Sequence, residues 1–189
     1  AASPPAPWSE IIPPGAKVLL YLGRLHPKKN LHSLLDAWAA VEKQASAGAD
    51  WWLVIVGWDQ AGYGDSLRRS ASGSRLRRIW FAGPRFGVEK VSCLQQADAF
   101  VLPSLSEGLP MAVLEAWAHQ LPAIMTTESN LENGFTAEAA VRITTDPGGI
   151  LSGLSRLFQM SDKERRMMGE RGRSLVEREY SWDAISEQM

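Results

Sequence analysis

Apolar residues gather in six short runs along the chain, and segments with helical spacing alternate with most of these runs. The runs are continuous and rich in β-branched residues, which is typical of strands covered on both faces. They lie at Val18–Leu22, Trp51–Val56, Arg78–Ala82, Ala99–Leu102, Ala123–Met125 and Val141–Ile143. Helical spacing is found at Leu31–Gln44, Asp65–Ser72, Val88–Gln96, Pro110–His119, Gly149–Met160, Asp162–Arg178 and from Trp182 onward. This alternation predicts an α/β fold built on a doubly wound, Rossmann-like parallel sheet.

The pattern also predicts one domain. Residues 1–16 hold five prolines and show no periodicity, so we expect a linker or a segment added during cloning. Residues 17–189 suffice for a single hydrophobic core. Because the first residue is not Met, we expect the chain to be part of a longer protein.

Composition and charge narrow the functional classes. Hydrophobic residues make up 45% and charged residues 22%, as in globular domains. A net charge of −1 argues against general affinity for nucleic acid or anionic membrane, so an anionic ligand needs a local cluster of cations. The single cysteine, Cys93, cannot form an internal disulfide, and no apolar run approaches membrane-spanning length. We therefore expect a cytoplasmic protein.

Ligands of such sheets bind beyond the carboxyl ends of the strands. The loops expected at that edge are Gly23–Asn30, Gly57–Gly64, Gly83–Gly87 and Pro103–Pro110.

The first of these loops combines turn residues with positive charge. Gly23 ends a strand, and Asn30 suits the N-cap of the next helix. Between them stand Arg24, Lys28 and Lys29, side chains that suit phosphate oxygens. The alternative is a solvated basic loop.

The fourth loop adds an expected anion site and two acids. Gly108 allows close backbone approach, and Pro110 suits the first turn of a helix, whose free N–H groups attract anions. Glu115 stands alone in an apolar helical run and needs hydrogen-bond donors, such as sugar hydroxyls or an arginine. The alternatives are a water-facing loop acid at Glu107 and a helix-stabilising acid at Glu115.

The two loops together resemble the GT-B glycosyltransferases of the large retaining family 4. The first matches the family's G-R-L-x-P-x-K loop, and Glu107 with Glu115 matches its E-x7-E motif. Further matches, in order and with the family's spacing over residues 17–189, are Gly57 with Asp59, Phe81-Ala82-Gly83, Ala97-Asp98 and Tyr180-Ser181-Trp182. The chain is thus similar to the C-terminal, donor-binding half of such an enzyme.

The resemblance implies a role for each matching residue. Arg24 and Lys29 would bind the donor diphosphate and offset charge on the leaving group, which is electrostatic catalysis. Glu107 would lie beside the donor sugar, and Glu115 would accept hydrogen bonds from the ribose. The remaining donor contacts would come from Gly23 and from main chain at Gly83, Pro84, Arg85, Gly108, Leu109, Met111 and Ala112.

It also implies the reaction: hexosyl transfer from a nucleoside-diphosphate sugar, with retention at the anomeric carbon. We expect no cofactor and no metal, because the chain contains no Asp-x-Asp motif and two cations can replace a magnesium ion. An N-terminal domain outside this chain would bind the acceptor and supply any association with the inner membrane face. The fragment alone would be inactive.

Departures from the family concern two segments. Thr126–Phe135 lacks the family's usual Gly-Gly turn, so no sugar contact is assigned there. His119 is expected to cap helix carbonyls, and with His26 and His32 it shows no zinc-ligand spacing relative to Cys93.

Three other functions are alternatives for this sequence. A nicotinamide-dependent oxidoreductase would need G-x-G-x-x-G after the first strand, where this chain has GRLHPK. An epimerase or phosphorylase of GT-B architecture would share the donor site. A non-catalytic binding module, including one for nucleic acid, would use the basic group Arg68, Arg69, Arg75, Arg77, Arg78 and Arg85, which we expect to be a solvated face.

Overall fold

The sheet is parallel and six-stranded, in a computed structural model that describes residues 4–44, 48–59 and 61–180. Its strands are β1 (Lys17–Leu22), β2 (Trp51–Val56), β3 (Ile79–Gly83), β4 (Ala99–Leu102), β5 (Ala123–Thr126) and β6 (Ala140–Ile143). They are ordered β3-β2-β1-β4-β5-β6, so the chain builds outward from β1 in one direction and then crosses back to build from β4 in the other.

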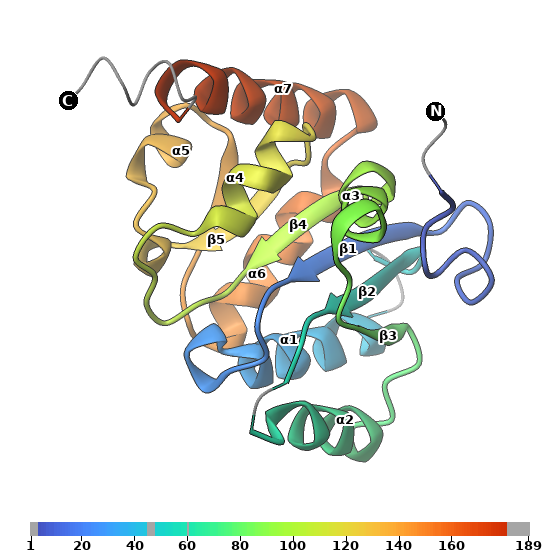
Figure 1. Ribbon diagram of the computed structural model, residues 1–189. Helices are drawn as coiled ribbons and strands as arrows, with labels where there is room; N and C mark the ends of the chain where they lie inside the picture. Colours follow the sequence, from blue (N-terminus) through green and yellow to red (C-terminus); the bar gives the residue numbers. More distant parts are fainter. Residues whose placement is uncertain (1–3, 45–47, 60, 181–189) are drawn as a thin grey trace.

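Helices cover both faces of the sheet (Figure 1). They are α1 (Leu31–Lys43), α2 (Tyr63–Gly73), α3 (Gly87–Gln96), α4 (Met111–Ala118), α5 (Glu132–Thr136), α6 (Pro147–Gln159) and α7 (Asp162–Glu179). Helix α1 packs beside α6 and α2, and α4 packs beside α7. None of the described helices is both long and apolar enough to cross a membrane.

The predicted α/β class and all six strands are confirmed. The bounds of β2 and β4 are those expected from the apolar runs, and the other four strands differ by one residue at one or both ends. The predicted helices within the described residues also form, whereas a helix from Trp182 onward lies outside them. The pattern did not predict α5 or the two short 3-10 helices at Pro27–Lys29 and Thr127–Ser129, because these turns are too short to show a helical period.

Close packing of α7 on α4 depends on two glycines. A Cβ atom on Gly169 would lie 1.8 Å from the backbone oxygen of Gln120, and one on Gly172 would lie 2.4 Å from the Trp117 ring. Larger side chains at these positions would push α7 off α4.

The proline-rich segment at the start is docked rather than extended into solvent. Its described part has no helix or strand of its own, yet Ala6, Trp8 and Ile12 are buried in the core. The Ser92 hydroxyl donates a hydrogen bond to the Pro4 carbonyl (2.7 Å), and the Ala6 N–H donates to Gln96 Oε1 (3.0 Å). These contacts fix the segment along α3.

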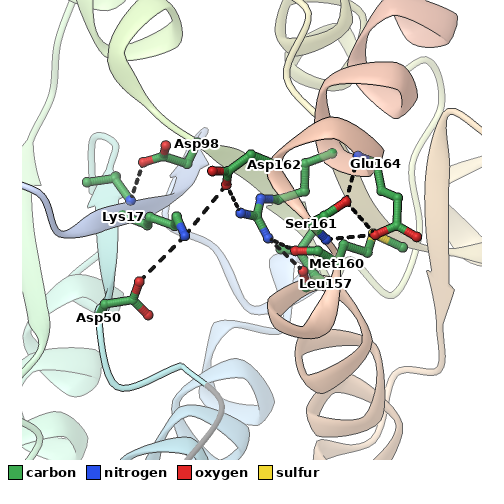
Figure 2. A network of polar contacts seen from close by, with 10 residues as sticks. Lys17, Asp50, Asp98, Leu157, Met160, Ser161, Asp162 and Glu164 are labelled. Carbon is green, nitrogen blue, oxygen red and sulfur yellow. Dashed lines mark hydrogen bonds and ion pairs between the residues drawn. The ribbon is translucent and has the colours of Figure 1, made fainter.

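A polar network ties the amino end of β1 to the start of α7 (Figure 2). The Lys17 ammonium lies 3.5 Å from Asp50 and 3.7 Å from Asp162, and the Asp98 carboxylate accepts a hydrogen bond from the Val18 N–H (2.7 Å). Asp162 also pairs with Arg165, which is 6% exposed. The network lies at the amino ends of the strands, on the opposite side from the loops of interest.

We expect Arg165→Ala to lower the free energy of unfolding by about 2–3 kcal/mol, because it removes a buried guanidinium that donates hydrogen bonds to the Met160 and Leu157 carbonyls. Urea unfolding would measure the loss. The neighbouring Arg166→Ala, at an exposed position of the same helix, is the matched control and should change stability by less than about 0.5 kcal/mol. Equal effects of the two substitutions would contradict the assignment.

Candidate donor-binding site

The first and fourth loops meet between β1 and β4, where the order of the sheet reverses. The backbone N–H of Leu105 donates to the Lys28 carbonyl (2.8 Å). The Asn30 side chain donates to the carbonyls of Pro103 (3.1 Å) and Thr145 (2.7 Å). Asn30 precedes α1 as predicted, but its side chain joins loops instead of capping the helix. These hydrogen bonds therefore fix the two loops relative to each other at the crevice expected beyond the carboxyl ends of the strands.

Glycines let the loops after β1 and β2 touch. A Cβ atom on Gly57 would lie 2.0 Å from the backbone oxygen of Gly23, so only glycine fits there. The contact is fixed on both sides by hydrogen bonds from Gly23 N–H to the Val56 carbonyl (3.0 Å) and from Leu25 N–H to the Trp58 carbonyl (2.9 Å).

A hydrogen bond from Tyr21 fixes the backbone at Arg24. Its hydroxyl donates to the Arg24 carbonyl (2.9 Å), and its side chain is fully buried. Burial, with the nearby Glu107 carboxylate, raises the pKa of Tyr21 far above its ordinary value, so the phenol remains a donor. The sequence pattern treats Tyr21 only as a strand residue and gives no signal for this contact.

Lys29 and Glu107 form an ion pair across the crevice. The Lys29 ammonium lies 2.5 Å from Glu107 Oε1, and the Ser104 hydroxyl donates to the same oxygen (2.6 Å). Their side chains are only 20% and 10% exposed. The residues expected to bind diphosphate and donor sugar are thus adjacent, and in this structure they bind each other.

Glu115 has a partner that the sequence analysis missed. Lys90, in the first turn of α3, places its ammonium 2.5 Å from Glu115 Oε1 on α4. Hydroxyls or an arginine were the expected donors, and a lysine from another helix supplies this contact instead. Each side chain is about one-third exposed, at 31% and 34%.

Arg24 faces a small hollow of about 170 Å³ beside this second ion pair. The lining includes Gly23, Arg24, Trp58, Pro84, Arg85 and Lys90. It contains three cations and no carboxylate, and within the described residues no acid pairs with Arg24. The Nε atom of Arg85 is buried and has no hydrogen-bond partner there. The hollow therefore has the positive charge to receive an anion.

Backbone donors at the start of α4 complete the crevice. Among the described residues, the N–H groups of Gly108, Leu109 and Ala112 have no protein acceptor. The N–H of Met111, expected to face the donor, instead bonds to the Leu109 carbonyl (2.9 Å). Three of the four predicted amides thus remain open to a ligand.

The structure also shows the surroundings of Cys93, of the possible metal ligands and of His119. Burial raises the pKa of the Cys93 thiol to about 11, so it stays protonated. In the part of the chain that the structure describes, no three His, Cys, Asp or Glu side chains gather as metal ligands would. His119 follows α4, where its backbone N–H bonds to the carbonyls of Glu115 and Ala116.

The basic group that a nucleic-acid-binding module would use is split between the two ends of the sheet. Arg78 donates to the Trp51 carbonyl at the amino end of β2 (3.4 Å), whereas Arg85 lines the hollow at the carboxyl end and lies 3.8 Å from Glu89. These two arginines therefore do not share one face.

A larger hollow of about 600 Å³ lies elsewhere, beside β6 and between α5 and α7. Its arginines are matched by acids, with Arg142 paired to Glu132 and Arg171 to Glu138. Size alone would favour this hollow, but its charges cancel and no predicted site residue lines it.

Comparison with known proteins shows the family of this chain. Residues 16–159 match the family described as "Glycosyl transferases group 1". The chain is 30% identical over 175 residues to the GDP-mannose-dependent monoacylated alpha-(1-6)-phosphatidylinositol monomannoside mannosyltransferase of Corynebacterium glutamicum, covering 88% of this chain and 44% of the relative. It is 27% identical over 179 residues to the D-inositol 3-phosphate glycosyltransferase of Salinispora tropica, covering 91% and 37%. The chain therefore spans about two-fifths of these relatives.

Solved structures show the same fold. The C-terminal domain of a group 1 glycosyl transferase, LpcC of Francisella tularensis, superposes with a TM-score of 0.79 at 21% identity and covers 95% of this chain and 96% of that one. Sucrose-phosphate synthase of Thermosynechococcus elongatus gives 0.80 at 23% identity, covering 97% and 46%. The fold is that of the C-terminal half of GT-B glycosyltransferases, and the chain belongs to the group 1 glycosyl transferases.

Proposed function

We propose that this chain binds a nucleoside-diphosphate sugar and forms the donor half of a retaining, metal-independent hexosyltransferase. The supporting observations lie in the segments after the strands: Arg24 and Lys90 line one hollow, Lys29 pairs with Glu107 just before α4, and Lys90 pairs with Glu115 on α4. Positive side chains and open backbone N–H groups there suit a pyrophosphate.

Arg24 and Lys29 bind the diphosphate in this proposal. Arg24 is ready for an anion, whereas Lys29 must first release Glu107. During transfer, negative charge grows on the departing diphosphate, and two fixed cations stabilise it without a metal ion.

The acids then bind hydroxyl groups. Glu107, freed from Lys29, accepts hydrogen bonds from the donor sugar, and the amides of Gly108, Leu109 and Ala112 donate hydrogen bonds to the donor. Glu115 accepts hydrogen bonds from the ribose, and main chain at Gly83, Pro84 and Arg85 meets the base. Glu107 exchanges its ammonium contact for hydroxyl donors as Lys29 turns to the diphosphate. Glu115 keeps Lys90 on Oε1 and binds hydroxyl groups through Oε2, so no charge is left without a partner.

The acceptor would be bound by a further domain that precedes residue 17, across an interdomain cleft. The partial coverage of the relatives supports this part of the proposal. Relatives named for phosphatidylinositol mannosides and for lipopolysaccharide core synthesis suggest lipid-linked or saccharide acceptors at the cytoplasmic membrane face.

Arg24→Ala and Lys29→Ala should each weaken nucleoside-diphosphate binding by about 1.5–3 kcal/mol, because each removes a charged hydrogen-bond donor. A thermal-shift panel of UDP-, GDP- and ADP-sugars would first identify the base, and calorimetry with the corresponding diphosphate would give the affinities. Lys28→Ala, which removes an exposed cation from the same loop, is the control and should have little effect. Unchanged affinity in both site variants would remove Arg24 and Lys29 from the site.

Glu107→Gln and Glu115→Gln should change nucleoside-diphosphate affinity in opposite directions. The first frees Lys29 from its competing carboxylate, so we expect tighter binding by roughly 1 kcal/mol, while sugar transfer by the full-length enzyme falls. The second removes the ribose acceptor and should weaken binding. Calorimetry would measure both, with Glu170→Gln on α7 as a charge-matched control; weaker binding by Glu107→Gln would contradict the partner exchange.

The 189-residue chain alone should bind the donor and transfer no sugar, because the acceptor site lies in the further domain. A radiolabelled-donor assay measures transfer to added acceptors. Robust turnover by the purified chain would contradict the proposal that a further domain binds the acceptor.

A further inference from the structure

Lys90 is a charged residue that none of the motifs includes, yet it occupies a central place in the candidate site. It extends from α3 to α4, two helices on the same face of the sheet, and its ammonium lies 2.5 Å from Glu115 Oε1. It also lines the hollow that Arg24 faces. Lys90 therefore connects the acid expected to bind ribose with Arg24, one of the two cations expected to bind phosphate.

The geometry at Glu115 leaves binding capacity for a ligand. A carboxylate has two oxygens with about four acceptor positions, and an ammonium has three donors. The contact between Lys90 and Glu115 is at Oε1, so Oε2 remains for hydroxyl groups. The ammonium likewise keeps donors that can point into the hollow.

Lys90 also restricts where the carboxylate can lie. Glu115 has three side-chain torsions and is about one-third exposed, so without a partner it could adopt several rotamers. A short charge-assisted contact selects one of them before the ligand arrives. Such preorganisation lowers the entropy lost on binding.

The helix that carries Lys90 is itself held in place. The docked segment at the start of the chain contacts Ser92 and Gln96, which follow Lys90 on α3, through Pro4 and Ala6. Because α3 is fixed by these contacts, the Lys90 ammonium is presented to Glu115 from a supported backbone.

We infer that Lys90 is a positioning residue of the nucleotide site: it holds Glu115 in the orientation that binds the ribose hydroxyls, and it adds a third positive charge beside the diphosphate. The inference rests on the proposed function. It makes discrimination between ribose and deoxyribose depend on a residue that does not itself need to touch the 2′-hydroxyl.

The test compares ribonucleoside and 2′-deoxyribonucleoside diphosphates on the full 189-residue chain. Calorimetry with GDP, UDP and ADP and with their 2′-deoxy forms gives a ribose preference for each variant. The variants are Lys90→Met, Lys90→Arg, Glu115→Gln and the double variant Lys90→Met with Glu115→Gln. Lys163→Met, at an exposed position on α7, is the control, and thermal unfolding checks that every variant folds.

We expect wild type to prefer the ribose form by about tenfold, the scale of one hydrogen bond to a charged group. Lys90→Met should lose most of this preference and bind nucleoside diphosphates more weakly. Lys90→Arg, which keeps a positive charge, should keep much of the preference. The double variant should lose no more preference than either single variant, because both act through one contact. Lys163→Met should match wild type.

Two results would overturn the inference. An unchanged ribose preference in Lys90→Met would show that Lys90 contributes charge alone or nothing at all. Additive losses of preference in the double variant would show that Lys90 acts independently of Glu115. If wild type binds none of the three diphosphates, the proposed function fails as well, so the two failures are distinguishable.

Discussion

The reversal of strand order between β1 and β4 is the constraint on which the site depends. Crossover connections from these neighbouring strands leave in opposite directions, so the loops at their carboxyl ends have no helix between them and can meet. The hydrogen bond between Leu105 and Lys28 and the side-chain bonds of Asn30 fix that meeting. The chemistry then follows from which side chains the two loops carry.

A site built this way has to remain stable without its ligand. Concentrated positive charge with no anion would repel itself, and half-buried acids without donors would be costly. Pairing Lys29 with Glu107 and Lys90 with Glu115 solves both problems. The hollow at Arg24 keeps an excess of positive charge although the whole chain is slightly negative, which suits the diphosphate of the proposed donor.

The strands and longer helices could be predicted because burial on both faces leaves a continuous apolar signal, as in Trp51–Val56. The candidate site residues could be named from the sequence where a motif concentrates them, at Gly23–Lys29 and Glu107–Glu115, and their chemistry stays a prediction. Tyr21, Ser104 and Lys90 could not be found this way. Tyr21 and Ser104 bond to residues three positions further along the chain, which depends on how each loop folds, and Lys90 meets an acid 25 positions away that no local pattern connects to it. The docking of residues 4–12 on α3 could not be predicted either, because a proline-rich composition indicates only the absence of regular structure.

The most direct test is a crystal structure of this chain with a nucleoside diphosphate bound. The account predicts phosphate oxygens within hydrogen-bond distance of the Arg24 guanidinium and the Lys29 ammonium, with Lys29 separated from Glu107 and the ribose on Glu115. Phosphates bound elsewhere, for example in the hollow beside Arg142, with the Lys29–Glu107 pair intact, would contradict it.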